Sequence, residues 1–205
     1  MRRESFWRAF REDLERHFGY CGNAGLLQKL RVALMTDGSW AAGVYRLGRA
    51  IETTKLGPLK PLLRAAHWPL ERVLRFVSGI HLDSRAEIAP GFYVGHFGSI
   101  YVGPGVRIGR DCNISQMCFI AAAEDGSGAP MIGERVYLGA GCKIVGNVRI
   151  GDGAAIGANA VVVEDVPANG VVAGVPAQLM SHKGSGDFIH PAAPGASEAS
   201  SAALH

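Results

Sequence analysis

The sequence lacks the features that would place it in a membrane, outside the cell or on nucleic acid. It contains no apolar run of about 18 residues, the length that a membrane-spanning helix needs. Its N-terminal stretch, MRRESFWRAFREDLERHF, carries acidic residues and no apolar signal core, so we expect a cytoplasmic protein. The 21 Lys and Arg against 18 Asp and Glu give a net charge of only +3, spread along the chain, which argues against nucleic acid as a partner.

Cysteine is scarce and is not spaced for metal binding. The chain has four cysteines, and no two of them are separated by the two residues that are typical of zinc sites. Cys112, Cys118 and Cys142 instead occupy positions of a repeat that elsewhere hold small residues. We therefore expect buried, reduced thiols that pack as small hydrophobes, and no metal ion.

What the chain has in abundance is glycine, with 28 residues, and an aliphatic residue at every sixth position. The series keeps one phase on both sides of an interruption between Ile120 and Ile132, after a slip of two residues before Val102. A period of six fits neither an α-helix nor an alternating strand. It predicts a solenoid of short parallel strands in which three hexads close one triangular coil, with the aliphatic residues inward. The series is Ile88, Val94, Val102, Ile108, Ile114, Ile120, Ile132, Leu138, Ile144, Ile150, Ile156 and Val162.

The region before the repeat is predicted to be helical. Apolar residues three and four positions apart recur between residues 5 and 78, with breaks at residues 36–39 and at Gly57-Pro58. Ser39 is expected to cap the helix after the first break. The last helix carries arginines beside its apolar stripe. We interpret it as a helix that packs on its neighbours or on a partner subunit, in preference to one that lies on a membrane surface.

These patterns divide the chain into three parts. We expect an α+β protein with an N-terminal helical domain over residues 1–79, a hexapeptide-repeat solenoid over residues 80–180 and a tail over residues 181–205. The tail is rich in Ala, Ser, Gly and Pro and is expected to be disordered. A polar, glycine-rich loop at residues 121–130 interrupts the solenoid, and loops on a rigid stack tend to carry function.

His96 is the most informative polar residue of the repeat. It follows the inward Val94 by two positions, which predicts an outward corner. Histidine titrates near neutral pH and can take a proton from a hydroxyl when a partner fixes its tautomer. An exposed histidine alone is more often inert, so the residue by itself indicates little.

Hexads ending in AGVPA, after a helical region that contains Tyr45-Arg46-Leu47-Gly48, resemble the serine acetyltransferases and related left-handed β-helix acetyltransferases. The stretches GHFGSI and GNVRIG add to this resemblance, which covers roughly residues 40–179. It implies a left-handed parallel β-helix, acetyl-CoA as co-substrate and assembly as a homotrimer or a dimer of trimers.

The resemblance gives His96 the role of the base that deprotonates the acceptor hydroxyl, so that its oxygen attacks the acetyl-CoA thioester. The family has an aspartate directly before this histidine, where this chain has Gly95, and a second, orienting aspartate upstream, where this chain has His81. Asp83 would share the face of His81 in a strand. Whether His81 or Asp83 supports His96 is open at this point.

On the donor side, the resemblance implies that acetyl-CoA lies in a groove between subunits and is held by the backbone of small residues. Small side chains let the pantetheine arm approach the backbone, whose N–H groups can stabilise a developing oxyanion. Any one of these residues alone is explained by turn geometry, but the set favours donor binding. The small residues are Ala122, Ala140, Gly141 and Ala158, with Lys143 and Gly174 nearby.

The loop departs from the family in a way that bears on the acceptor. The family carries an arginine and a histidine just before the proline that re-enters the repeat, whereas this chain has Gly128 and Ala129. A free carboxylate would lose charge-assisted contacts worth roughly 1.5–3 kcal/mol each. We therefore expect an acetyl-CoA-dependent O-acetyltransferase for a small hydroxyl acceptor other than L-serine, such as a sugar or a polysaccharide precursor. The alternatives are a serine O-acetyltransferase of cysteine biosynthesis and a catalytically inactive solenoid scaffold.

Overall fold

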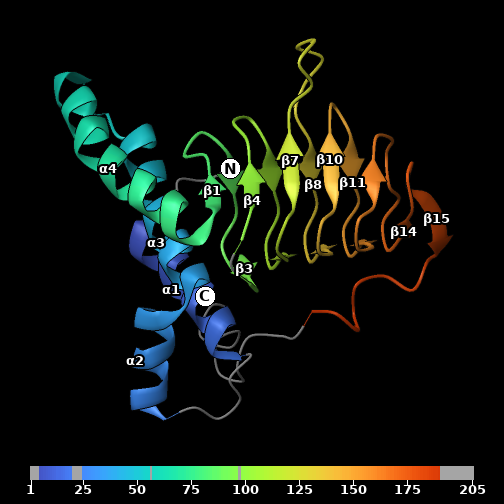
Figure 1. The fold of residues 1–205 in the computed structure, drawn as a ribbon, viewed down its shortest axis with the longest axis horizontal. Helices are drawn as coiled ribbons and strands as arrows, with labels where there is room; N and C mark the ends of the chain where they lie inside the picture. The colour runs from blue at the N-terminus through green and yellow to red at the C-terminus, as the bar shows by residue number, and fades with distance from the viewer. Residues whose placement is uncertain (1–4, 20–24, 56, 97, 190–205) are drawn as a thin grey trace, which may run out of the picture.

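The computed structural model describes residues 5–19, 25–55, 57–96 and 98–189 (Figure 1). It confirms the predicted fold class, because helices at the N-terminus are followed by a parallel β-solenoid. No helix in these ranges is both long enough and apolar enough to cross a membrane. Residues 190–205 of the predicted tail lie outside the described ranges.

The helices precede the solenoid in the order α1 (Phe6–Gly19), α2 (Leu26–Met35), α3 (Asp37–Thr53), η1 (Gly57–Leu59) and α4 (Lys60–Ser78). The first predicted break between helices, at residues 36–39, is confined to Thr36, which separates α2 from α3. Ser39 does not cap α3 as expected, because α3 already begins at Asp37. The Ser39 hydroxyl lies in the first turn of α3 and contacts Thr36 Oγ1 at 2.7 Å.

The solenoid consists of three sheets, one on each side of a triangular coil. Sheet A has the order β1-β4-β7-β10-β13, sheet B the order β2-β5-β8-β11 and sheet C the order β3-β6-β9-β12-β14, with the antiparallel β15 after β14. The chain visits the sheets in the order A, B, C. The strands are β1 (Ile80–Leu82), β2 (Glu87–Ile88), β3 (Tyr93–Val94), β4 (Ile100–Val102), β5 (Arg107–Ile108), β6 (Asn113–Ile114), β7 (Phe119–Ala121), β8 (Met131–Ile132), β9 (Tyr137–Leu138), β10 (Lys143–Val145), β11 (Arg149–Ile150), β12 (Ala155–Ile156), β13 (Val161–Val162), β14 (Val171–Ala173) and β15 (Gln178–Ser181).

The aliphatic series of the repeat fills the interior, as predicted. Every third member stacks on the next coil, so that Ile88 pairs with Ile108 and Ile108 pairs with Ile132. All members from Ile88 to Val162 are at most 4% exposed. Because a fully buried aliphatic side chain contributes about 1.5–3 kcal/mol, this column supplies much of the stability of the solenoid.

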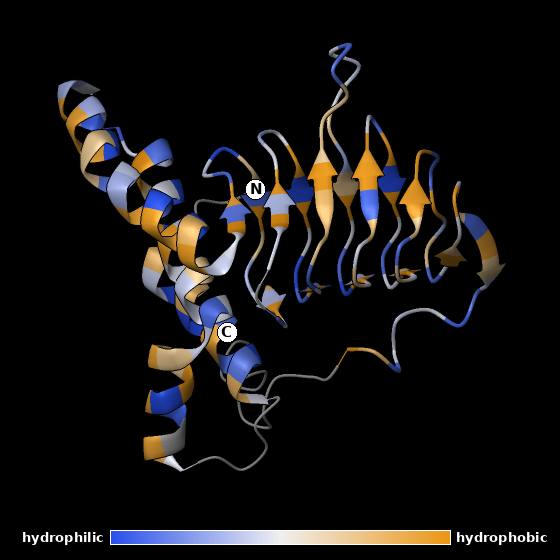
Figure 2. Cartoon of the chain, viewed as in Figure 1, coloured by the Kyte–Doolittle hydropathy of each residue, from blue (hydrophilic) through white to orange (hydrophobic). Residues whose placement is uncertain are grey.

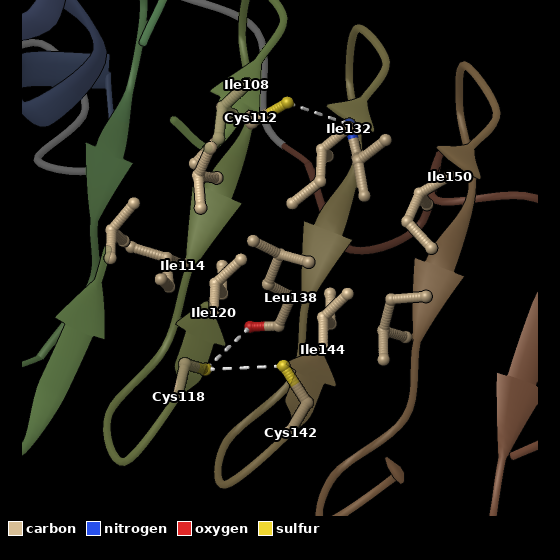
Figure 3. Close-up of a cluster of buried hydrophobic side chains, with 14 of the residues drawn as sticks. Ile108, Cys112, Ile114, Cys118, Ile120, Ile132, Leu138, Cys142, Ile144 and Ile150 are labelled. Atoms are coloured by element: carbon tan, nitrogen blue, oxygen red, sulfur yellow. Dashed lines mark hydrogen bonds between the residues drawn. The ribbon is translucent and has the colours of Figure 1, made fainter. Parts of the chain in front are cut away.

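The cysteines of the repeat are free and buried, as predicted. Figure 3 shows Cys118 and Cys142 on neighbouring coils, with their sulfur atoms 3.5 Å apart. Burial raises the pKa of the Cys112 thiol to about 12. These thiols are therefore packing groups in an apolar core.

A buried polar network joins the helices to the solenoid. Arg46 of α3 forms an ion pair with Asp13 of α1, with Nε 2.7 Å from Oδ2. Its Nη1 donates to Ile88 O at 2.5 Å and its Nη2 to Ala89 O at 2.9 Å. Asp13 also accepts the backbone N–H of Phe92 at 3.0 Å. Two helices and the first coil are thus held through one pair of charges.

The outer face of α4 is apolar and uncovered. Val73, Phe76 and Val77 are 61%, 91% and 73% exposed, and Figure 2 shows orange bands along this helix. The opposite face packs on α3 and β1. The face of α4 that packs on α3 and β1 is therefore the one that contributes to the core.

The chain after β15 turns back along the solenoid. Phe188 stacks on Tyr137 with a centroid distance of 4.8 Å, and the Ser185 N–H donates to Gly153 O at 2.8 Å. Asn113 Nδ2 donates to Phe188 O at 3.3 Å. Residues 182–189, which belong to the tail expected to lack order, thus lie against sheet C.

The loop at residues 121–130 leaves sheet A after β7 and returns at β8. Figure 1 shows it projecting away from the stack. The Ala123 N–H donates to Gly128 O at 3.0 Å, which closes the base of the loop. The Ser127 N–H donates to Asp125 Oδ1 at 2.8 Å at its tip. The interruption of the repeat is therefore a local excursion that leaves the stacking of the coils intact.

Candidate active site

His96 lies in the turn between β3 and β4, at the edge where sheet C meets sheet A, and it is exposed. The backbone on both sides of it is fixed. The Gly95 N–H donates to Ile114 O at 3.0 Å, and the Gly98 N–H donates to Ser78 O at 2.8 Å. The second bond places the His96 turn directly on the end of α4.

The close approach of α4 to this turn depends on Gly79. This residue caps α4 in the left-handed region with φ 71°. A Cβ atom there would lie 2.7 Å from the Ser99 nitrogen, well inside a normal contact. Glycine at this position therefore allows the helix end to reach the turn that carries His96.

A ladder of backbone hydrogen bonds runs along the same edge from coil to coil. The Met117 N–H donates to Gly98 O, the Gly141 N–H to Gln116 O and the Asn159 N–H to Ala140 O, all at 2.8–3.1 Å. The last coil joins through Val161 N–H and Gly174 O at 3.0 Å. The structure therefore aligns four of the predicted donor-binding residues in one row with His96. They are Ala140, Gly141, Ala158 and Gly174.

The row has dimensions that suit an extended ligand. Neighbouring coils are separated by about 4.8 Å, the usual spacing of strands in a sheet. Ala140 and Ala158 therefore lie about 10 and 14 Å along the edge from the His96 turn. Ala158 is exposed, and Ala140 is partly exposed, so a ligand along this edge would meet backbone with little side-chain cover.

Lys143 and Ala122 occupy different places relative to this row. Lys143 begins β10, and its Nζ donates to Gly141 O at 3.0 Å, so the side chain folds back toward the edge. Ala122 directly follows β7, at the opposite edge of sheet A beside the loop. The structure thus brings five of the six predicted donor-binding residues together and leaves Ala122 across the sheet.

The two residues considered as supports for His96 differ clearly in their surroundings. His81 lies in the middle of β1, two residues after Gly79, and its side chain is 11% exposed. Asp83 follows the end of β1 at the far edge of the sheet, and its carboxylate accepts the Nε, Nη2 and backbone N–H of Arg85 at 2.8–3.0 Å. Burial opposes ionisation of Asp83, but these bonds outweigh it and lower the pKa of the carboxyl.

His81 is held by two residues of α4 that the sequence did not single out for the site. Its Nδ1 lies 2.6 Å from Arg75 Nη2 and 3.1 Å from Glu71 Oε1. Burial and the charge of Arg75 lower the pKa of His81, so its ring is neutral at neutral pH. Arg75 is one of the arginines beside the apolar stripe of α4, and the sequence does not reveal which side of this helix faces β1.

An aromatic surface extends from His81 across sheet A. The ring of His81 contacts Tyr101 at a centroid distance of 5.2 Å, and Tyr101 stacks on Phe119 at 5.0 Å. These residues occupy the same register in β1, β4 and β7. Within the described ranges, no group of three or more His, Cys, Asp or Glu side chains is arranged to hold a metal ion.

Comparison with known proteins identifies the family. A model of the family Bacterial transferase hexapeptide (six repeats) matches residues 129–163. A serine acetyltransferase from Helicobacter pylori strain J99 is 31% identical over 155 residues, which cover 75% of this chain and 86% of that protein. The chain belongs to the serine acetyltransferase family.

Other members of the serine acetyltransferase family are similar over different shares of their length. The protein from Mycobacterium tuberculosis is 32% identical over 130 residues, and this chain spans 57% of its length. The Neisseria gonorrhoeae enzyme, solved in complex with serine, is 26% identical with a TM-score of 0.71 over 84% of this chain and 68% of that one. A serine acetyltransferase solved in complex with CoA is 26% identical, with a TM-score of 0.72 over 86% of this chain and 70% of that one.

The expectation of an acceptor other than L-serine was wrong. The relatives are serine acetyltransferases, and their solved structures include a complex with serine and one with cysteine. The expectation rested on Gly128 and Ala129 in the loop, where the resemblance implies an arginine and a histidine.

Proposed function

We propose that this chain is a serine O-acetyltransferase that transfers the acetyl group of acetyl-CoA to the hydroxyl of L-serine. The observation that carries the proposal is the backbone ladder that aligns His96 with Ala140, Gly141 and Ala158 along one exposed edge. Relatives solved with serine and with CoA support both substrates. The products are O-acetylserine and free CoA.

In the proposed reaction, His96 takes the proton of the serine hydroxyl as the oxygen attacks the thioester carbonyl. The tetrahedral intermediate collapses, the carbon–sulfur bond breaks and the CoA sulfur leaves with the proton that His96 returns. His96 is thus base in the first step and acid in the second.

His81 is the better candidate for supporting His96. The Asp83 carboxylate is engaged by Arg85, whereas His81 lies on the part of β1 that adjoins the His96 turn. A neutral histidine orients a neighbouring imidazole but compensates its positive charge less well than a carboxylate. His81→Asp is therefore expected to raise kcat, whereas Asp83→Asn leaves it within about twofold. A fall in kcat with His81→Asp would contradict this role.

Donor binding along the edge can be tested with two equivalent alanines. Ala158 and Ala168 are both exposed. Each precedes an asparagine with positive φ, which is Asn159 in the first case and Asn169 in the second. The two alanines lie on different edges of the solenoid. Ala158→Tyr should raise the KM for acetyl-CoA by at least tenfold, because it blocks access to the backbone. Ala168→Tyr introduces the same bulk away from the row and should leave that KM unchanged. Equal effects of the two substitutions would refute the proposed donor site.

The proposed assembly is a homotrimer or a dimer of trimers. Ala122 lies across sheet A from the row, so it could reach the same donor only if a second copy contributed it. The uncovered apolar face of α4 also suits contact with another copy. A cytoplasmic location stays a prediction from the sequence.

The proposed function is tested by following thiol release from acetyl-CoA with L-serine, homoserine, amino sugars and sugar nucleotides as acceptors. L-serine should give the highest kcat/KM. A sugar or sugar nucleotide that exceeds L-serine would overturn the proposal. Absence of turnover with every acceptor, together with no acetyl-CoA binding by calorimetry, would instead favour the scaffold.

A further inference from the structure

L-serine carries an ammonium and a carboxylate beside the hydroxyl that is acetylated. Removing both charges from water is costly unless the site supplies opposite charges with hydrogen bonds. If the proposed function is correct, the region around His96 therefore needs a cation for the carboxylate and an anion for the ammonium. The inference below rests on that proposed function.

The loop at residues 121–130 supplies no cation. Its sequence contains Glu124 and Asp125 but no Lys, Arg or His. Two other cations near sheet A are already engaged. Arg85 is bound to Asp83 through both Nε and Nη2, and Lys143 Nζ donates to Gly141 O within the proposed donor row.

Arg75 keeps donors for a ligand and lies on the stretch of α4 that leads to the His96 turn. It precedes Ser78 by nearly one turn of α4, and Ser78 O accepts the N–H of Gly98. The contacts of Arg75 within the described structure all run through Nη2, which leaves the donors of Nε and Nη1 for a ligand. Its side chain is 42% exposed, so that a small acceptor can reach the guanidinium.

Glu71 provides the opposite charge at the same place. Its Oε1 lies 2.9 Å from Arg75 Nη2, and its side chain is 26% exposed. Both residues contact Nδ1 of His81, whose ring rests on Tyr101. A carboxylate and a guanidinium thus stand side by side on α4, about two turns and one turn before its end at Ser78, and both contact His81, whose ring rests on Tyr101.

We propose that Glu71 and Arg75 form the head-group site for the acceptor, in which Arg75 binds the carboxylate and Glu71 binds the ammonium of the α-amino acid. The two charges lie side by side, with Glu71 Oε1 2.9 Å from Arg75 Nη2, and both groups contact Nδ1 of His81. This site takes over the charge recognition that the loop of this chain does not provide. It selects α-amino acids that carry a hydroxyl over sugars and over simple alcohols.

The site is tested by measuring kcat and KM for three acceptors that differ in one charge each. L-serine carries both charges, L-serinamide lacks the carboxylate and L-glycerate lacks the ammonium. Arg75→Gln should raise the KM for L-serine about ten- to a hundredfold, because a charge-assisted contact is lost, while the KM for L-serinamide changes less than about twofold. Glu71→Gln should likewise raise the KM for L-serine and leave that for L-glycerate nearly unchanged.

Arg72→Gln is the matched control. Arg72 lies on the same helix with its guanidinium over the ring of Trp68, and its loss should leave all three KM values unchanged. Arg75→Lys keeps the positive charge and serves as a second variant in case Arg75→Gln is poorly folded. It should recover part of the affinity for L-serine.

The outcomes separate this inference from the proposed function. Turnover of L-serine by the wild-type protein with an unchanged KM in both Arg75 variants would overturn the head-group site alone. Equal rises in KM for L-serine and L-serinamide would also overturn it, because they would indicate a structural role for Arg75. No turnover of L-serine by the wild-type protein would overturn the proposed function and this site with it.

Discussion

Replacing Arg46 by methionine tests how the helices are held on the solenoid. The Arg46 side chain is 6% exposed and that of its partner Asp13 is 1% exposed, so the pair is shielded from water. Arg46 bonds Asp13 through Nε and Nη2, and it also donates to the carbonyl oxygens of Ile88 and Ala89. Methionine fills a similar volume but leaves the Asp13 carboxylate without its compensating charge.

The expected cost of Arg46→Met is about 3–5 kcal/mol, the range for breaking a buried ion pair by removing one partner. The loss should appear as a lower free energy of unfolding in urea and as faster amide hydrogen exchange in α1 and α3. Asp13→Asn/Arg46→Met should be less destabilised than the sum of its single variants, because the double variant contains no uncompensated charge.

Arg49→Met is the control for this experiment. Arg49 is on the same helix and pairs with Glu87, but the two side chains are 28% and 33% exposed. Such a pair is worth about 0.2–1 kcal/mol. If Arg46→Met cost no more than Arg49→Met, the buried network would not be what holds the helices in place.

Further predictions concern pH, thiol reactivity and the C-terminal segment. Burial lowers the pKa of His17 and of His81, so their contribution to stability is complete above about pH 6.5 and is lost as the pH falls through the lowered values. The urea midpoint should therefore be lower at pH 5.5 than at pH 7.5, and a midpoint that rises on acidification would contradict this. Because burial raises the pKa of Cys112 to about 12, iodoacetamide should label it only in urea, and labelling of the native protein would show that the coil is open. Phe188→Ala removes the stack on Tyr137 and should speed hydrogen exchange in residues 182–189 by about tenfold, whereas unchanged exchange would show that the stack does not hold the segment.

The repeat was predictable because its period is a local property of the sequence. The hexad rule needs only the identity of residues six apart, and it located inward positions such as Ile114 and Ile144, which are 1% and 0% exposed. The placement of His96 at an exposed corner follows from the same rule. Stacking of equivalent turns then aligns Ala140 and Ala158 with it, since every coil repeats the geometry of the one before.

The contacts between helices and solenoid were not predictable, because they join residues that are far apart in the chain. Arg46 and Ile88 are 42 positions apart, and neither pattern nor spacing indicates that they meet. The same is true of the side of α4 that carries Arg75 toward His81. The acceptor was misjudged because the expectation rested on the residues of the loop alone, whereas the relatives are serine acetyltransferases.

The most direct test of the central claim is the identity and the rate of formation of the product from L-serine and acetyl-CoA. Mass spectrometry and NMR should show O-acetylserine with the wild-type protein, and His96→Ala should form it about 10²- to 10⁴-fold more slowly while the fold is kept. Failure of the wild-type protein to form O-acetylserine would contradict the proposed activity. An undiminished rate in His96→Ala would contradict the assignment of the base.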